Sequence, residues 1–164
     1  MSLHDDLLRQ AGQLARSEPR RPKQASLRRA VSTAYYALFH LLINEGATVM
    51  SPMNEVQLRV IVARAYQHGA MKAVASDVLK GKFSKGYSDL GLSPSPELRS
   101  VARTFYGLQE KRHEADYDIG ASFTRDEVLK LVTQSEQAFK DWRHVRGTKE
   151  AMVFLQSMLL KGRD

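Results

Sequence analysis

The sequence predicts an all-α protein, and three observations carry this prediction. Apolar residues recur at spacings of three and four in most long segments, as they do on one face of an amphipathic helix. No stretch alternates apolar and polar residues in the way that a half-buried strand does. Ten glycines and five prolines in 164 residues are fewer than average. With a hydrophobic content of 43%, residues 1–164 are expected to form one domain, an up-and-down bundle of five to six helices.

The first two helices are predicted from their apolar spacing. The first should end before Pro19, because a proline keeps the preceding residue out of the helical region. The second should run from Gln24 to about Glu45 and end at Gly46. The apolar face of the first helix holds Leu3, Leu7, Ala11 and Leu14, and that of the second holds Leu27, Val31, Ala34, Leu38, Leu41 and Leu42.

Cap residues predict where the next helices begin and end. Ser51 followed by Pro52 is typical of an N-cap and a first helical position, so a helix is expected from there to about Tyr66. A further turn or two, from Ala70 to Lys80, should end at Gly81.

A long loop precedes the last three helices. Residues 81–96 have no helical period and hold several glycines and prolines, so we expect a functional or disordered loop. Ser95 and Pro96 should start a helix that reaches Ala115. Thr124 and Glu127 form a capping box before an apolar stripe that extends to Trp142. A last short helix should hold Met152, Leu155 and Leu159.

Composition excludes several classes of protein. The chain has no cysteine, which excludes disulfides, thiolate metal sites and a cysteine nucleophile. It has no apolar run of about 20 residues, and Asp5, Asp6 and Arg9 interrupt the N-terminal apolar residues, so neither a membrane span nor a signal peptide is expected. It also lacks a phosphate-binding glycine loop, a His-Glu-x-x-His pair and a serine nucleophile elbow. We therefore expect a cytoplasmic protein with no membrane contact, no metal and no cofactor.

The positive charge is concentrated in the first half of the chain. The net charge of +7 divides into +6 for residues 1–82 and +1 for residues 83–164. The densest cluster lies between Arg16 and Arg29, where one acidic residue, Glu18, stands among six basic ones. These are Arg16, Arg20, Arg21, Lys23, Arg28 and Arg29. Such a cluster favours either a polyanionic partner or a solvated face that keeps the protein soluble.

Two polar groups interrupt the apolar pattern of the helices. On the second helix, Arg29, Thr33, Tyr36 and His40 fall in one narrow strip, which is either a buried hydrogen-bond network or the wall of a groove. On the helix that begins at Ser95, Arg112 and Asp116 fall on the face expected to be core. Burying two charges costs desolvation free energy, so this pair should either fix the packing register of the helix or form part of a functional site.

Two further sets of residues are weaker candidates. His113 and Tyr117 are four residues apart on the strip beside Arg112 and Asp116. In the long loop, basic and aromatic residues alternate, a pattern that holds single-stranded nucleic acid but also occurs in plain connectors and dimer contacts. The loop residues are Lys80, Lys82, Phe83, Lys85 and Tyr87. The remaining histidines, His4, His68 and His144, are expected on the surface.

Two segments resemble the HEPN superfamily. The segment RRAVSTAYYALFHLL, residues 28–42, is similar to the Arg/Ser-x-x-Tyr-Tyr-Ala-x-Phe-His helix of that superfamily. The segment KRHEADYD, residues 111–118, is similar to the Arg-x-x-Ala-Asp-Tyr element of one branch. The resemblance implies a HEPN-like helical bundle that dimerises and binds RNA or nucleotides. It also implies a possible nucleotidyltransferase-like partner in a toxin–antitoxin pair, and in many members metal-independent ribonuclease activity.

The chain departs from the pattern of the active ribonucleases. Those branches place a histidine four to six residues beyond the arginine, whereas here His113 directly follows Arg112 and points about 100° away. The first interpretation is therefore an RNA- or nucleotide-binding module. The alternatives are an endoribonuclease that uses Arg112 with His113 or His40, assisted by Tyr117, and a non-catalytic protein-interaction domain. We expect a homodimer in which the second helix or the helix ending at Tyr117 takes part, because both carry more apolar surface than a small bundle covers.

Overall fold

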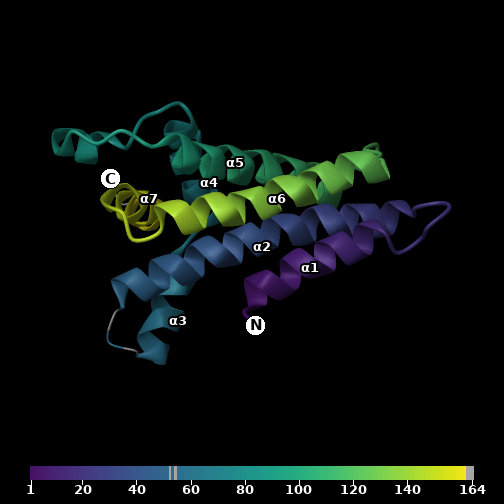
Figure 1. Ribbon diagram of the computed structural model, residues 1–164, viewed down its shortest axis with the longest axis horizontal. Helices are drawn as coiled ribbons and strands as arrows, with labels where there is room; N and C mark the ends of the chain where they lie inside the picture. The colour runs from purple at the N-terminus through teal and green to yellow at the C-terminus, as the bar shows by residue number, and fades with distance from the viewer. Residues whose placement is uncertain (52, 54, 162–164) are drawn as a thin grey trace. The chain divides into compact units, whose positions relative to one another are not determined.

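The structure, a computed structural model, describes residues 1–51, 53 and 55–161. Throughout these ranges the regular elements are helices and no strand occurs, which confirms the predicted all-α class (Figure 1). The described chain has more helices than the five to six expected. In order they are α1 (Leu3–Ala15), α2 (Gln24–Met50), α3 (Val56–Ala65), α4 (His68–Leu79), the 3₁₀ helix η1 (Lys85–Leu90), α5 (Pro96–Tyr117), α6 (Arg125–Val145) and α7 (Lys149–Leu160).

The chain divides into two compact units, each built from separate stretches of sequence. The first unit comprises Met1–His40 and Thr104–Lys140, and the second comprises Leu41–Arg103 and the chain from Asp141 onward. The boundaries fall inside α2, α5 and α6.

The core of the first unit joins residues that are far apart in the sequence. One cluster of seven buried residues in this core comes from α1, the first half of α2, the end of α5, the loop that follows α5, and the start of α6. They are Ala15, Leu27, Ala30, Val31, Ala115, Phe123 and Val128. The predicted apolar face of α2 is thus core.

The second unit has a core on α4 and α7, which pack against each other. α4 contributes Met71, Val74, Ala75 and Val78 to the buried residues. From α7, Phe154 is fully buried with its ring 6.4 Å from that of Trp142. By contrast, α3 buries none of its residues.

The predicted caps of α5 and α6 are confirmed. Ser95 Oγ accepts from the Leu98 backbone N–H at 3.2 Å. In the capping box, the Glu127 N–H donates to Thr124 Oγ1 at 3.2 Å and the Thr124 N–H donates to Glu127 Oε2 at 2.8 Å. The hydrogen bonds from Thr124 lower the pKa of Glu127. These local signals position both helices correctly because they depend on residues only three apart.

The predicted end of α2 at Gly46 is wrong, because the helix continues to Met50. A Cβ at Gly46 would lie 2.0 Å from the Tyr66 hydroxyl, so glycine is needed there for close approach. Tyr66 is buried and donates to the Leu155 carbonyl at 3.1 Å, and burial raises the pKa of its hydroxyl to about 12. The glycine therefore serves tertiary packing and not helix termination.

The predicted start of α3 at Ser51 is also wrong. The Ser51 N–H donates to the Ala47 carbonyl at 3.0 Å, which prolongs the last turn of α2, and α3 begins only at Val56. Pro52, the expected first helical position, lies outside the described residues. At the end of the predicted third helix, Tyr66 and Gln67 have extended backbone, so a separate α4 begins at His68.

The long loop and the apolar faces differ in part from expectation. The segment 81–96 contains η1, and Gly81, with φ of +84°, follows α4 as predicted. The predicted apolar face of α2 is buried, and the exposed large apolar side chain of this helix is Val49, near its end. Large apolar side chains are also exposed at Tyr117 and Ile119, which lie at the end of α5 and just beyond it, and on α3 at Val56, Leu58, Val60 and Ile61.

Candidate functional site

A groove in the first unit lies between two helix faces with identical residue spacing. Figure 1 shows α1 beside α2, joined by the connector of residues 16–23. Side chains at intervals of four, three and four residues share one helix face, and both helices supply such a row. The groove has a volume of about 500 Å³ and is lined by Leu3, Leu7, Gln10 and Leu14 of α1 and by Arg29, Thr33, Tyr36 and His40 of α2. The polar strip predicted on the second helix is therefore one wall of a groove.

The leucine row predicted on the apolar face of α1 lies largely outside the core. Leu3 is exposed, and Leu7 and Leu14 are only partly buried. The buried residues of α1 are the small ones, Ala11, Gly12 and Ala15. Small side chains bring α1 close to its neighbours and leave the leucines at the edge of the contact, where they form the apolar wall of the groove.

The groove contains polar groups that are available to a ligand. The Arg29 guanidinium makes no ion pair or hydrogen bond with any residue in the described part of the chain, and the same is true of the His40 imidazole. Burial lowers the pKa of His40, and the nearby His4 lowers it further. His40 is therefore neutral near pH 7 and has one donor and one acceptor nitrogen.

His4 departs from the expected surface position. Only 14% of its side chain is exposed, and its ring lies 5.8 Å from that of Phe139. A single histidine in an amphipathic helix gives no sequence signal for this contact, because Phe139 is on a helix far along the chain.

Behind Tyr36, the cation of Arg112 is surrounded by tyrosine rings. Its Nη2 donates to the Tyr36 hydroxyl at 3.0 Å. Its Cζ lies 5.8, 5.5 and 5.7 Å from the ring centroids of Tyr35, Tyr36 and Tyr117. Burial disfavours the Arg112 charge, but the tyrosine oxygens and Asp116 outweigh this effect and raise its pKa. Arg112 thus holds Tyr36 in place by two contacts, one with the face of the Tyr36 ring and one with the Tyr36 hydroxyl.

The predicted pair of Arg112 and Asp116 is present, but it is less buried than expected. Arg112 Nε lies 2.9 Å from Asp116 Oδ2 without the alignment of a hydrogen bond. The side chains are 18% and 30% exposed, so the pair borders solvent. The reason is position: Asp116 lies in the last turn of α5, where the helix runs out toward the surface.

Sequence reasoning missed the partner that Asp116 has on α2. The Ser32 hydroxyl, which is almost fully buried, donates to Asp116 Oδ1. Helical spacing could not reveal this contact, because the two residues are 84 positions apart, although both lie in the segments that resemble one family. Ser32 links these segments directly.

Arg28 was predicted only as part of the basic cluster and of the HEPN-like segment, and the structure shows that it fixes the loop that follows α5. Its Nη1 donates to the carbonyls of Ala115 and Asp118 at 2.9 and 2.8 Å. Its Nη2 donates to the carbonyls of Ile119 and Ala121. One arginine therefore binds four backbone carbonyls, so its role is to hold the end of α5 against α2.

His113 and Tyr117 lie at the surface. Both residues are exposed, and their rings are in contact, with centroids 5.0 Å apart and planes tilted by 50°. Tyr117 therefore contacts His113 and Arg112, whose side chains leave the helix in different directions as predicted. The His40 ring and the Arg112 guanidinium both lie near the ring of Tyr36, 6.4 and 5.5 Å from its centroid.

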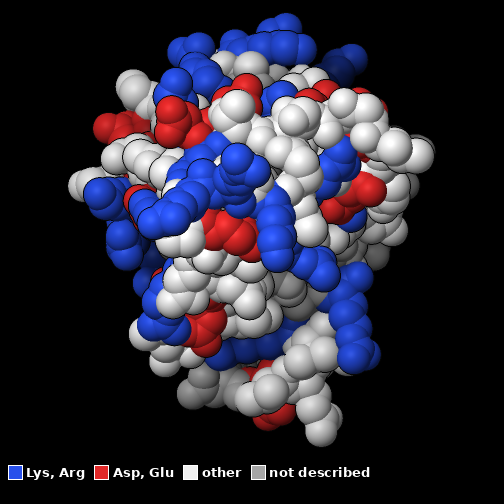
Figure 2. Space-filling model, turned by 90° about the vertical axis from the view of Figure 1, so that its right-hand side faces the viewer, with Lys and Arg blue, Asp and Glu red and all other residues white. Residues whose placement is uncertain are grey.

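In the basic connector, residues 16–23, the side chains of Arg20, Arg21 and Lys23 are exposed. Arg125 holds it in place by donating to the carbonyls of Ala15, Glu18 and Pro19. Figure 2 shows the side of the molecule on which this connector lies in Figure 1, and Lys and Arg side chains spread over much of that face with acidic side chains between them.

The remaining candidates are not part of the groove. Lys82 and Lys85 are exposed residues of the second unit. The structure thus assigns the proposed nucleic-acid residues to two units, with Arg29 and Tyr36 in the first. In the ranges that the structure describes, no group of three or more histidine or acidic side chains is arranged to hold a metal. Across the same ranges, no helix has the length and apolar character required to cross a membrane.

Comparison of the chain with models of known protein families, with curated proteins and with solved structures found no match. The class that the structure itself defines is an all-α protein whose first unit carries a groove with a cationic and aromatic wall.

Proposed function

We propose that this chain is a HEPN-like RNA- or nucleotide-binding module, and that the groove between α1 and α2 holds one nucleotide of a single-stranded RNA or a free nucleotide. The observation that carries the proposal is the combination on one groove wall of an available arginine, an aromatic ring and a neutral histidine. The likeness of residues 28–42 and 111–118 to HEPN segments supports it.

Each wall residue suits one part of a nucleotide. Arg29 is exposed and matches a phosphate with its planar fork of donors. Tyr36 offers a ring to a base, since stacking contributes about 1 to 3 kcal/mol per base. His40 and Gln10 provide hydrogen bonds, and the leucines of α1 cover the apolar part of the ligand. The volume of about 500 Å³ suits one nucleotide better than a folded RNA element.

Arg112 and Asp116 act as positioning residues in this proposal. Their contacts with Tyr36 and Ser32 fix the orientation of the Tyr36 ring before a ligand binds. Loss of Arg112 should therefore weaken stacking although Arg112 itself touches no nucleotide.

The family resemblance also supports the proposed partners. We propose a homodimer, a nucleotidyltransferase-like protein as partner in a toxin–antitoxin pair, and a cytoplasmic location. The exposed Tyr117 and Ile119 near the end of α5 favour that end of the first unit as the dimer contact.

Fluorescence anisotropy with a labelled single-stranded RNA of about one dozen nucleotides tests the groove, with unlabelled nucleoside monophosphate as a competitor. Arg29→Gln and Tyr36→Leu should each weaken binding about tenfold, the loss of one charge-assisted hydrogen bond or one stacked base. The matched control is Arg9→Gln, which removes an exposed arginine of α1 that pairs with Asp6 and does not line the groove.

The competitor separates the two ligands. Competition at low concentration indicates a nucleotide site, and weak competition indicates that RNA is the ligand. If wild type binds neither, or if Arg29→Gln changes binding no more than Arg9→Gln, the proposal is wrong and a protein-interaction domain becomes the better interpretation.

His40 favours ribonuclease activity as a second candidate function. A neutral histidine on a groove wall with an arginine is suited to accept the proton of a 2′-hydroxyl. Cleavage of a mixed RNA pool with a chelator present should be compared for wild type, His40→Ala, His113→Ala and Arg112→Ala. Activity lost only in His40→Ala places catalysis in the groove, activity lost in His113→Ala places it at the α5 surface, and no cleavage by wild type leaves binding alone.

A further inference from the structure

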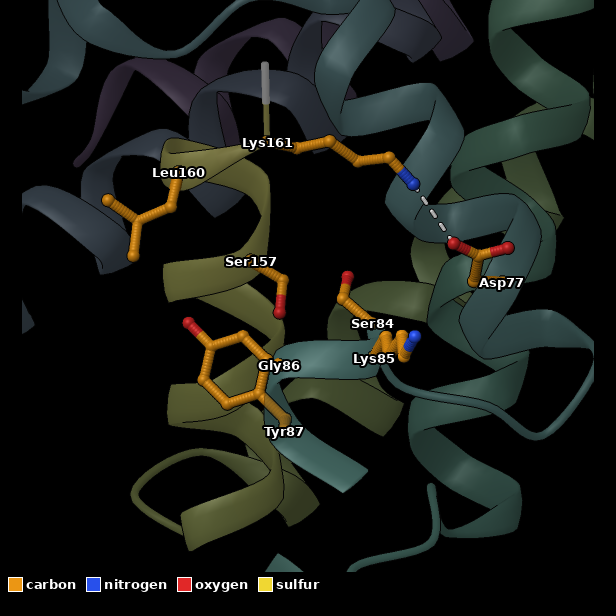
Figure 3. A pocket seen from close by; sticks show the side chains of 8 residues that line it. All are labelled: Asp77, Ser84, Lys85, Gly86, Tyr87, Ser157, Leu160 and Lys161. Carbon is orange, nitrogen blue, oxygen red and sulfur yellow. Dashed lines mark hydrogen bonds and ion pairs between the residues drawn. The ribbon is translucent and has the colours of Figure 1, made fainter. Parts of the chain in front are cut away.

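A second pocket lies in the second unit and shares no residue with the groove. Its wall combines the end of α4, the start of η1 and the last turn of α7, and its volume is about 570 Å³. The lining residues are Asp77, Ser84, Lys85, Gly86, Tyr87, Ser157, Leu160 and Lys161 (Figure 3).

A buried hydroxyl without a partner points into this pocket. Ser157 is 3% exposed, and its Oγ makes no hydrogen bond with the residues that the structure describes. Figure 3 shows the hydroxyl directed toward the space between Ser84 and Tyr87. A buried polar atom without a partner is unfavourable, and a helical serine usually avoids this by bonding to the carbonyl of the preceding turn. A ligand atom in the pocket would satisfy it.

The polar groups across the pocket are also available. Ser84 precedes η1 without making a side-chain cap hydrogen bond. Within the described ranges, the Ser84 and Tyr87 hydroxyls and the Lys85 ammonium make no hydrogen bond or ion pair. The pocket lining therefore holds three hydroxyls and one ammonium that are available to a ligand.

The charge of the pocket favours an anion. The carboxylate in its lining, Asp77, lies 3.0 Å from the Lys161 ammonium, so these two charges neutralise each other. The charge that remains is that of Lys85. The Tyr87 ring and Leu160 form an apolar side, which would contact the organic part of a ligand.

We propose that this pocket binds a small phosphate monoester whose organic group is flat and apolar. Lys85 and the hydroxyls of Ser84 and Ser157 hold the phosphate, and Tyr87 and Leu160 contact the ring. Phosphate suits this lining because its oxygens accept several hydrogen bonds at once, whereas a neutral ring compound would leave Lys85 unused. The proposal does not depend on RNA binding in the first unit.

Phenyl phosphate is the probe, followed by NMR titration of the ¹⁵N-labelled full chain. Residues 84–87 and 157–161 should shift together, with inorganic phosphate binding more weakly and phenol more weakly still. Lys85→Gln should weaken binding about tenfold, because it removes a hydrogen bond to a charged group. The matched control is Lys82→Gln, which removes an exposed lysine of the same loop that does not line the pocket and should change binding less than about twofold.

Two more variants test the detail of the proposal. Ser157→Ala should weaken binding severalfold while leaving the melting temperature of the free protein unchanged or higher, because it removes an unsatisfied hydroxyl. Asp77→Asn should tighten binding, because it frees the Lys161 ammonium and removes the negative charge of the lining. Failure of phenyl phosphate to shift these residues at millimolar concentration, or equal binding by Lys85→Gln and Lys82→Gln, overturns the proposal whatever the outcome of the RNA assays.

Discussion

Removal of the Asp116 carboxylate measures how far the contact between the two HEPN-like segments stabilises the protein. In Asp116→Ala, the buried Ser32 hydroxyl loses its acceptor, which costs about 1 to 2 kcal/mol. The ion pair with Arg112 contributes about 0.5 kcal/mol more, because both side chains reach solvent. Arg112 keeps the Tyr36 hydroxyl and the tyrosine rings, so its charge is not left without partners. We expect a total loss of about 2 kcal/mol, below the roughly 3 to 5 kcal/mol of a fully buried pair.

Urea unfolding followed by far-UV circular dichroism gives this value. The matched control is Glu114→Ala on the same helix, which breaks an exposed ion pair with Lys111 and should cost at most about 0.5 kcal/mol. A double-mutant cycle with Ser32→Ala should give a coupling energy of about 1 kcal/mol. A loss in Asp116→Ala no greater than that in Glu114→Ala, or additive effects in the cycle, would refute the reasoning.

Three further predictions concern packing, pH and salt. Gly46→Ala should lower the free energy of unfolding by about 2 kcal/mol, because the new Cβ displaces Tyr66. Gly107→Ala should raise it by about 0.5 to 1 kcal/mol, because a Cβ there meets nothing within 4 Å. Urea midpoints of the two variants that move in the same direction would contradict this prediction. The folded-state pKa of His40 lies below its ordinary value of 6.5, so the unfolded chain binds the extra proton first as pH falls. Stability should therefore fall as pH drops through and below 6.5, and His40→Gln should reduce this slope of melting temperature against pH. Charge reversal at Arg20, Arg21 and Lys23 should lower the affinity for RNA. The slope of log binding constant against log salt concentration should become shallower by about 0.7 for each phosphate that is no longer neutralised. An unchanged slope would identify the connector as a solubilising face only.

Local signals in the sequence were sufficient for several elements of the fold. The capping box of α6 and the cap of α5 act through backbone groups within one turn, so they could be located without knowledge of the fold. The polar strip on α2 was predicted for the same reason, because helical spacing alone places its four residues on one face.

The sequence-based predictions were wrong or incomplete where the position of a residue depends on a contact with a residue distant in the sequence. Gly46 resembles a helix terminator until Tyr66 is placed against it. The leucines of α1 have the spacing of a core face, but the residues of this helix that are buried are the small ones, Ala11, Gly12 and Ala15. Ser32 gives no local signal of its partner, since Asp116 lies 84 residues away.

The division of the chain into interleaved segments has a consequence for folding during synthesis. The helices α1 and α2 emerge first, but the core residues Ala115, Phe123 and Val128 that complete their packing come from the last third of the chain. At about 5 to 20 residues per second, roughly 4 to 18 s pass between the emergence of residue 40 and that of residue 128. The second unit is also completed only by α7. The first unit is complete only when the first part of α6 has been made, and the second only when α7 has been made, so the apolar face of α2 lacks part of its packing during that interval.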